Sequence, residues 1–281
     1  MKTLLTFPGK IGDFFHQFRA ARQFIRSHDG PVHLWLDQGT LSGMDDLLAT
    51  ANHGPTPFTW ETRVGIKNYL LGGQPYDFGL NGDPPEGFDQ VIHLGFRDHP
   101  DGPITLDAAD LLKLAPKDLT EMVHQQTFWP PWPPVTRQVG RLVFHSPLLC
   151  HTGPVQSAWE VLVKLRDDFA LEIHFPDILV VGTAEEVAYA RELGFNGEVA
   201  DWFRTASLLV GCDALLAGGS SVASLAGLVA CPCCRIGQAF EVAGFPYPRA
   251  FNNLAPRQVS LPPDRRDLAG QAFDFLIANR R

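Results

Sequence analysis

Long apolar runs are missing from this sequence of 281 residues. No stretch approaches the roughly 18 apolar residues that a membrane-spanning helix needs. The first ten residues hold too short an apolar run for an export signal, and no Asn-x-Ser/Thr glycosylation site occurs. Cysteine is scarce too, and its five residues, an odd number, suit no disulfide framework. We therefore expect a protein of the reducing cytoplasm with no transmembrane segment.

An excess of positive charge is also absent. The formal net charge is −8, from 23 Lys and Arg against 31 Asp and Glu. This excludes a protein whose whole surface tracks nucleic acid or anionic lipid. The charge is uneven, because residues 1–134 carry 10 basic and 16 acidic residues, and residues 135–281 carry 13 and 15. Lys164 is the only lysine of the second segment, so an anionic ligand there would be bound by arginine.

What the chain does contain is an alternation of short apolar runs with segments whose apolar residues recur at helical spacing. Strands are expected at 2–7, 32–37, 58–61, 88–96, 142–146, 178–181, 213–217 and 233–236. Helices are expected after residue 10, at 41–51, 105–114 and 156–169, after the Thr183 cap, and at 199–209, 220–229 and 268–277, the last capped by Asp264. The alternation predicts an α/β fold with mostly parallel sheets and crossover helices.

Residues 128–134 read Phe-Trp-Pro-Pro-Trp-Pro-Pro. Four prolines exclude a helix or a central strand, because proline has no amide hydrogen to donate. We interpret this segment as a stiff linker between two doubly wound α/β domains, residues 1–134 and 135–281. Hydrophobic residues make up 45% of the chain, enough for a core in each domain.

The loop between the first strand and the first helix contains Gly9, Lys10 and Gly12. In open α/β sheets, ligands bind beyond the carboxyl ends of the strands, so this loop is expected to face a ligand. Asp13 comes next, and two interpretations of it are open: it caps the helix, or its carboxylate takes part in the reaction. His16 lies three residues later, on the same helical face. The loop is no phosphate-binding P-loop, because isoleucine follows the Gly-Lys pair.

A second glycine-containing turn lies at 218–221, where Gly218-Gly219 follows a strand and Ser220-Ser221 opens a helix. The amides of a first helical turn have no partners within the helix, and the helix dipole favours negative charge there. With two hydroxyls and two glycines, the turn is typical of a site that holds a diphosphate. The alternative is a serine N-cap with glycines for a tight turn.

The cysteines indicate neither a metal nor a nucleophile. Cys231-Pro232-Cys233-Cys234 has no second cysteine pair or spaced histidine pair beside it, so no metal site is expected. Cys150 and His151 are adjacent on an extended chain, and their side chains would point to opposite faces. They are therefore not a nucleophile and base pair.

Four segments carry recognisable motifs in one order along most of the chain. The first, Ile11-Gly12-Asp13-Phe14-Phe15, is an I-G-D-hydrophobic-hydrophobic opening, and the last, residues 219–232, follows D-S-G-x-x-H-L-A-A-x-x-G-x-P without a gap. Between them lie an apolar strand at 88–95 and a strand ending in Gly-Thr-Ala-Glu at 178–185. Together these motifs resemble those of the heptosyltransferase-like glycosyltransferases of family 9.

The resemblance implies two Rossmann-like domains that face each other across a cleft, the GT-B arrangement. The second domain would hold the donor nucleotide and the first the acceptor. By the same resemblance, Asp13 and His16 are the catalytic candidates. The donor diphosphate would bind Gly218, Gly219, Ser220, Ser221 and Ser224, the nucleotide Gly182 and Thr183, and an acceptor or phosphate Gly9, Lys10 and Gly12.

Some departures from the family pattern in the second domain bear on donor binding. Gly219 occupies the usual place of Asp, and Ser224 the usual place of His. The family's lysine after the first strand of this domain has no counterpart, so His145, His151 or an arginine would have to offset the charge of the diphosphate.

The sequence therefore predicts a metal-independent, inverting hexosyl- or heptosyltransferase without a cofactor, which uses a nucleotide-diphosphate sugar and an acceptor hydroxyl. A lipopolysaccharide-type glycan is the family's usual acceptor, and a small glycan, a peptide or a modified nucleobase are alternatives. The acidic first domain disfavours phosphate-rich acceptors such as nucleic acid. Two other functions stay open: a nucleotide-sugar epimerase on the same frame, and a non-catalytic module that binds a nucleotide or glycan.

Overall fold

A computed structural model describes residues 1–7, 11–37, 44–52, 57–63, 85–94, 108–109, 111–119, 135–150, 153–154, 157–237, 241–242, 245–246, 257–264 and 266–281. The chain divides into two compact units, Met1–Pro131 with Phe240–Phe251 (unit 1) and Trp132–Ala239 with Asn252–Arg281 (unit 2). The predicted linker at 128–134 lies outside the described residues, so its role as a hinge stays a prediction.

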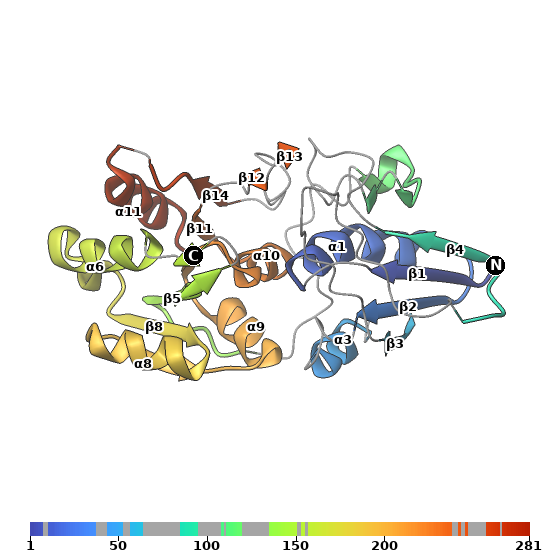
Figure 1. Ribbon diagram of the computed structural model, residues 1–281, viewed down its shortest axis with the longest axis horizontal. Coiled ribbons are helices and arrows are strands. Elements are labelled where there is room, and N and C mark those ends of the chain that lie inside the picture. Colours follow the sequence, from blue (N-terminus) through green and yellow to red (C-terminus); the bar gives the residue numbers. More distant parts are fainter. Residues whose placement is uncertain are drawn as a thin grey trace. The chain divides into compact units, whose positions relative to one another are not determined.

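Unit 1 contains a parallel four-stranded sheet in the order β3-β2-β1-β4 (Figure 1). Its elements are β1 (Thr3–Phe7), α1 (Ile11–Ser27), β2 (Val32–Asp37), α3 (Asp45–Ala51), β3 (Thr59–Arg63) and β4 (Gln90–His93). All five residues of β1 are buried, as expected of a central strand that is covered on both faces. Phe14 of α1 packs on Phe7 and Phe18, with ring centroids 5.2 and 5.1 Å apart, and so fixes the helix against the sheet.

Unit 2 contains a parallel six-stranded sheet in the order β9-β8-β5-β10-β11-β14. Its strands are β5 (Arg141–His145), β8 (Asp177–Gly182), β9 (Asn196–Val199), β10 (Ala214–Ala217), β11 (Cys233–Ile236) and β14 (Gln258–Leu261). Numbered along the chain within this sheet, the strands follow the order 3-2-1-4-5-6 that is characteristic of a dinucleotide-binding Rossmann domain. The predicted parallel α/β architecture is confirmed in both units.

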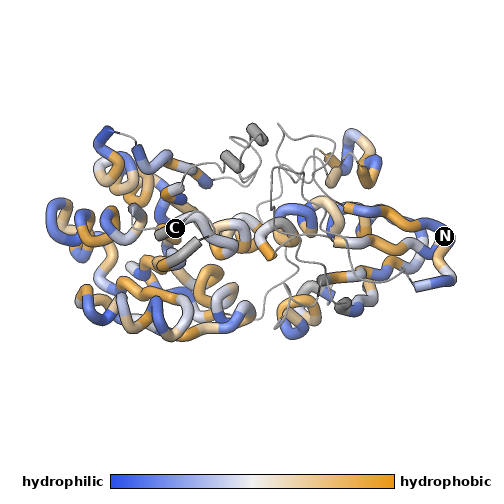
Figure 2. The backbone as a smooth tube through the Cα atoms, in the orientation of Figure 1, coloured by the Kyte–Doolittle hydropathy of each residue, from blue (hydrophilic) through white to orange (hydrophobic). Residues whose placement is uncertain are grey.

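Helices of unit 2 and two short hairpins are also described. The helices of unit 2 are α6 (Ser157–Phe169), α7 (Leu171–His174), α8 (Ala184–Glu192), α9 (Trp202–Gly211), α10 (Ser221–Leu228) and α11 (Leu268–Asn279). Two antiparallel pairs join β6 (Leu149–Cys150) to β7 (Gly153–Pro154) and β12 (Glu241–Val242) to β13 (Phe245–Pro246). Hydrophobic residues are concentrated on the strands and on the helix faces turned toward them (Figure 2).

Four of the five cysteines are buried in unit 2. Cys233 and Cys234 are buried in β11, and burial raises the pKa of the Cys233 thiol to about 12. Cys212 and Cys231 are also buried, with their sulfur atoms 3.5 Å apart. These thiols are therefore unreactive core residues. Over the described ranges, no three His, Cys, Asp or Glu side chains are grouped to hold a metal ion.

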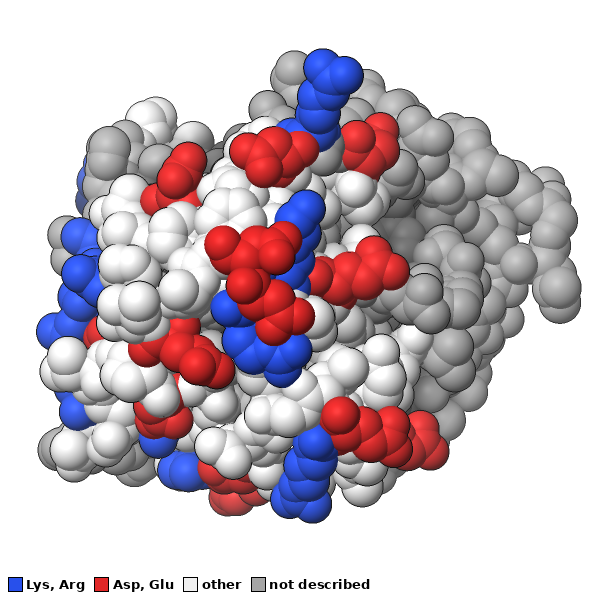
Figure 3. All heavy atoms as spheres, turned by 90° about the vertical axis from the view of Figure 1, so that its left-hand side faces the viewer, with Lys and Arg blue, Asp and Glu red and all other residues white. Residues whose placement is uncertain are grey.

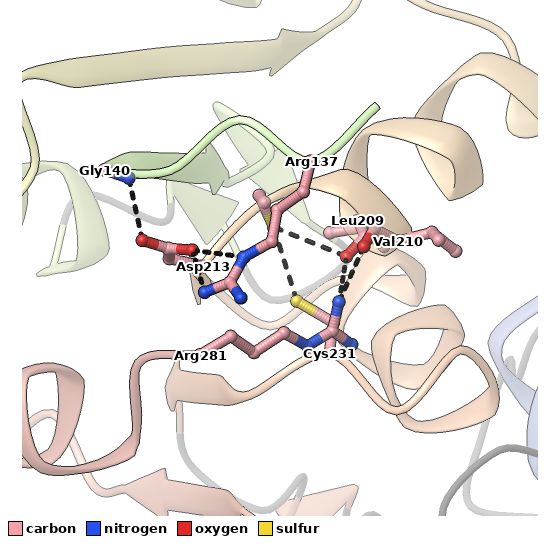
Figure 4. A network of polar contacts seen from close by, with 8 residues as sticks. Arg137, Gly140, Leu209, Val210, Asp213, Cys231 and Arg281 are labelled. Carbon is pink, nitrogen blue, oxygen red and sulfur yellow. Dashed lines mark hydrogen bonds and ion pairs between the residues drawn. The ribbon is translucent and has the colours of Figure 1, made fainter. Parts of the chain in front are cut away.

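Two arginines, Arg137 and Arg281, donate hydrogen bonds to loops and helix ends at the amino-terminal edge of this sheet (Figure 4). Arg137 donates to Asp213, which also accepts the Gly140 amide at 2.8 Å. The Arg281 guanidinium donates to carbonyls at the ends of α9 and α10, those of Leu209, Val210, Val229 and Ala230. These are carbonyls that a helix end leaves without partners, so Arg281 caps both helices.

Candidate functional site

The strand order of unit 2 locates a ligand site. The chain leaves β5 toward β8 and β9 on one side and returns to β10, β11 and β14 on the other. Ligands of such sheets bind at this switch point, beyond the carboxyl ends of the two central strands. Ala217 at the end of β10 lies beside His145 at the end of β5, and the Gly218 amide donates to the His145 carbonyl at 2.9 Å. The loops that follow these two strands therefore lie next to each other.

Gly218 lets the two loops approach. A Cβ atom at this position would collide with the Ser146 hydroxyl and lie 2.9 Å from the Ser146 Cβ. Gly219 differs, because among the described residues a Cβ there would meet the Arg235 Nη2 alone, at 3.9 Å. Of the two glycines, Gly218 is required by close packing, and Gly219 lies next to a guanidinium with no closer contact from the described residues.

We expect Gly218→Ala to lower the free energy of unfolding by about 1–3 kcal/mol, because the added methyl forces the Ser146 loop to move. Gly219→Ala is the matched control and should change it by no more than about 0.5 kcal/mol. Urea unfolding of the two variants compares them directly. Equal destabilisation would mean that the packing against Ser146 does not decide the effect.

Ser220 and Ser221 open α10 as the sequence predicts, but Ser220 does not cap the helix. It occupies the N-cap position with extended backbone angles, and its side chain makes no capping hydrogen bond. Its hydroxyl oxygen is buried and has no hydrogen-bond partner within the described part of the chain. Ser220 is therefore the N-cap residue of α10 by position, as the alternative has it, but its hydroxyl does not cap the helix. Ser224 is buried one turn further along α10.

His145 and Glu186 also lie at the carboxyl edge of this sheet, His145 at the end of β5 and Glu186 in α8, the helix after β8. The His145 Nε2 is 4.0 Å from the Glu186 carboxylate, and both side chains are largely buried. Burial lowers the pKa of the His145 imidazole, and the carboxylate raises it only in part. Its Nδ1 is buried without a hydrogen-bond partner among the residues described. His145 therefore brings a neutral imidazole to the switch point.

Arg235 is a site residue that the sequence reasoning missed. It follows the two buried cysteines of β11, lies beside Ala217 in the sheet, and is 7% exposed. Burial lowers the pKa of its guanidinium, and the nearby Cys233 raises it. The signal in the sequence is a single basic residue inside an otherwise apolar strand.

Gly182 and Thr183 have a local structural role. The Thr183 hydroxyl accepts the Glu186 amide at 3.3 Å, and the Glu186 carboxylate accepts the Thr183 amide at 2.7 Å, which completes the capping box at the start of α8. A Cβ atom at Gly182 would collide with the Glu186 carboxylate, so this box requires glycine there. Contact of these two residues with a nucleotide stays a prediction.

The candidates of unit 1 are described only in part. Gly9, Lys10 and the side chain of Asp13 lie outside the described residues. Helix α1 begins at Ile11, so Asp13 is its third residue and not the residue before it, and Gly12 lies in the first turn. His16 is three positions after Asp13 and is 4% exposed. This spacing places both residues on one side of the helix, as predicted.

A hollow of about 500 Å³ also occurs on the outer face of unit 2, between α6 and α8. None of its lining residues comes from the loops that follow β5 and β10. Acidic and basic side chains are interspersed over this face (Figure 3). The charged residues of the lining are Glu160, Lys164, Asp167 and Asp168. With no histidine, serine or cysteine in its wall, we assign it no chemistry.

Comparisons with known proteins bear on the fold. No protein-family model and no curated sequence matches the chain. Solved structures do match: Escherichia coli heptosyltransferase WaaC with ADP-2-deoxy-2-fluoro heptose is 11% identical with a TM-score of 0.57, over 99% of this chain and 100% of that one. E. coli ADP-heptose lipopolysaccharide heptosyltransferase II is 10% identical, with a TM-score of 0.58 over 99% of both chains. A family 9 glycosyltransferase from Veillonella parvula is 9% identical, with a TM-score of 0.58 over 93% and 85% of the chains.

The first two of these similarities cover 99% of the chain and so include both units. The chain has the GT-B fold of the heptosyltransferases, as the sequence motifs predicted. Among the described helices, none combines the length and apolar character needed to cross a bilayer.

Proposed function

We propose that this chain is a metal-independent, inverting glycosyltransferase that transfers a sugar from a nucleotide-diphosphate donor to an acceptor hydroxyl in the cytoplasm. The observation that carries the proposal is the Ser220 hydroxyl, which is buried at the start of α10, at the switch point, and does not cap its helix. The GT-B fold supports it, since one structure with this fold is a heptosyltransferase with ADP-2-deoxy-2-fluoro heptose. A lipopolysaccharide-type glycan is the first acceptor to test, and a modified nucleobase an alternative.

The start of α10 suits the leaving group of such a reaction. When the bond between the anomeric carbon and the diphosphate oxygen breaks, the electron pair stays on that oxygen and negative charge increases. The amides of the first turn and the hydroxyls of Ser220 and Ser221 are donors for this charge, fixed in place before the reaction. Gly219, which has no side chain, lets a phosphate approach the backbone, whereas Gly218 packs against Ser146.

Activation of the acceptor is assigned to Asp13. Its carboxylate would accept the proton of the acceptor hydroxyl as the oxygen attacks the anomeric carbon. Attack from the face opposite the diphosphate inverts the configuration at that carbon. His16, on the same side of α1, is the second candidate for the base.

A thermal-shift screen against nucleotide sugars tests donor binding first. A ligand at 100 times its Kd adds about 2.7 kcal/mol to the free energy of unfolding. Incubation of the hit with and without acceptors then follows, with analysis of the products. Transfer with inversion supports the proposal, whereas epimerisation of the donor without an acceptor indicates an epimerase. Binding without transfer to any acceptor indicates a binding module.

We expect the double variant Ser220→Ala, Ser221→Ala to bind the donor more weakly, by at most about 1.5–3 kcal/mol for each hydroxyl. Its melting temperature should stay near that of the wild type, because Ser220 makes no capping bond. Asp201→Ala is the contrasting control. The Asp201 carboxylate accepts the Arg204 amide at 2.7 Å and caps α9, so its loss should cost about 1 kcal/mol of stability and no donor affinity. Unchanged donor affinity in the double variant would argue against the assigned site.

A further inference from the structure

A buried positive charge borders the start of α10. Arg235 lies at the third position of β11 and pairs with Ala217, the last residue of β10. Model Cβ atoms at Gly219 and Gly237 would meet its Nη2 and Nε, each at 3.9 Å. The guanidinium is therefore adjacent to both glycines, at the carboxyl edge of the sheet where Ser220 begins the turn into α10.

The local potential at this edge is positive for two independent reasons. The first-turn amides of α10 carry the positive end of the helix dipole, and the arginine beside them stays protonated even though burial lowers its pKa. An anion at the start of α10 would be attracted both by the helix dipole and by the guanidinium.

Two further polar atoms belong to residues at the same edge and have no partner among the described residues. The Ser220 hydroxyl oxygen and the His145 Nδ1 are both buried and make no hydrogen bond there. A buried polar group that makes no hydrogen bond costs free energy, so a ligand that bonds to either atom gains that free energy. A cation, a hydroxyl and helix amides together match the oxygens of a phosphate.

We propose that Arg235 binds the diphosphate of the nucleotide donor and supplies the positive charge that offsets the leaving group. The inference rests on the proposed function and names a residue for it that comes from β11, not from the loop after β5. A guanidinium can donate two parallel hydrogen bonds to phosphate oxygens. Gly219 matters for the same reason, because without a side chain it puts no atom of its own between the ligand and the Nη2.

Isothermal titration calorimetry with ADP, UDP, GDP, CDP and dTDP, each paired with its nucleoside, tests the inference on the full chain. Arg235→Gln should weaken binding of the preferred diphosphate about 10- to 100-fold and change nucleoside binding less than about twofold. Arg235→Lys, which keeps the charge but loses the planar fork, should fall between the wild type and Arg235→Gln. Raising the salt concentration should weaken diphosphate binding more in the wild type than in Arg235→Gln.

Arg280→Gln is the matched control, since it also removes one positive charge. Arg280 is exposed and lies at the other edge of the sheet, where the amide of its neighbour Arg281 donates to the Asp213 carbonyl. It should leave the diphosphate affinity unchanged. If the wild type binds none of the five diphosphates, the proposed function fails and the inference with it. If the wild type binds one and Arg235→Gln binds it equally well, the inference alone is overturned.

A second pair of variants covers the case in which Arg235→Gln does not fold. Gly219→Asp and Gly219→Asn add side chains of one size beside an intact Arg235, and the backbone of Gly219 lies outside the left-handed region. The aspartate would pair with the guanidinium, so it should bind the diphosphate at least tenfold more weakly than the asparagine variant. Equal affinities would show that the ligand does not reach Arg235 and would overturn the inference.

Discussion

Replacement of Asp13 by asparagine is expected to lower turnover about 100- to 10,000-fold, once a donor and an acceptor are known. Asparagine has the size of aspartate but cannot accept a proton from the acceptor hydroxyl. Donor affinity should stay unchanged, because the proposed donor site consists of unit 2 residues. The melting temperature should also change little, since asparagine is tolerated near the start of a helix. Turnover, donor Kd and melting temperature are measured on one preparation.

Asp45→Asn provides the matched control for Asp13→Asn. Asp45 is an exposed acidic residue in the first turn of α3, so its substitution makes the same change in helix electrostatics. It should leave turnover at the wild-type level. Near-wild-type turnover of Asp13→Asn would remove Asp13 as the base and direct attention to His16. A large drop in melting temperature with a proportional loss of activity would instead assign Asp13 a structural role.

The central strands of both sheets could be predicted from the sequence because they are buried on both faces. The expected strands at 32–37 and 233–236 coincide with β2 and β11. The sequence analysis did not predict β9 and β14, which are the two edge strands of unit 2. An edge strand is partly solvated and carries polar residues, and Asn-Gly-Glu-Val and Gln-Val-Ser-Leu contain no apolar run to reveal it.

Two helix starts in unit 2 differ in how far their caps could be predicted. The capping box of Thr183 and Glu186 is confirmed. The expected cap of the last helix, Asp264, was wrong, because α11 begins after Asp267, which has a left-handed backbone and makes no capping bond. Because Asp267 makes no capping hydrogen bond, the sequence contains nothing that favours it as the cap over Asp264, three residues earlier.

The proposed donor site illustrates the same limit. The turn at 218–221 was predicted because a strand, two glycines and a helix start are adjacent in the sequence. Arg235 could not be predicted, because its nearness to Gly219 depends on the pairing of β10 with β11. That register is a tertiary property, and a basic residue within an apolar strand does not by itself indicate which loop it reaches.

Loss of the Asp213 carboxylate is expected to cause a large loss of stability. Asp213 is 3% exposed and precedes β10, where it accepts the Gly140 amide at 2.8 Å and the Arg137 guanidinium at 3.0 Å (Figure 4). Asp213→Ala leaves the buried Gly140 amide without an acceptor and removes a charged hydrogen bond. We expect a decrease of about 2–4 kcal/mol in the free energy of unfolding, measured by urea denaturation.

Two further variants separate the contributions of the amide and the ion pair. Asp213→Asn keeps an oxygen for the Gly140 amide and should lose less stability than Asp213→Ala. Arg137→Gln should lose about 1 kcal/mol or less, because the Arg137 side chain is half-exposed and water can replace its contact with the carboxylate. If Arg137→Gln were as destabilising as Asp213→Ala, the ion pair and not the bond to the Gly140 amide would hold this loop at the start of β5.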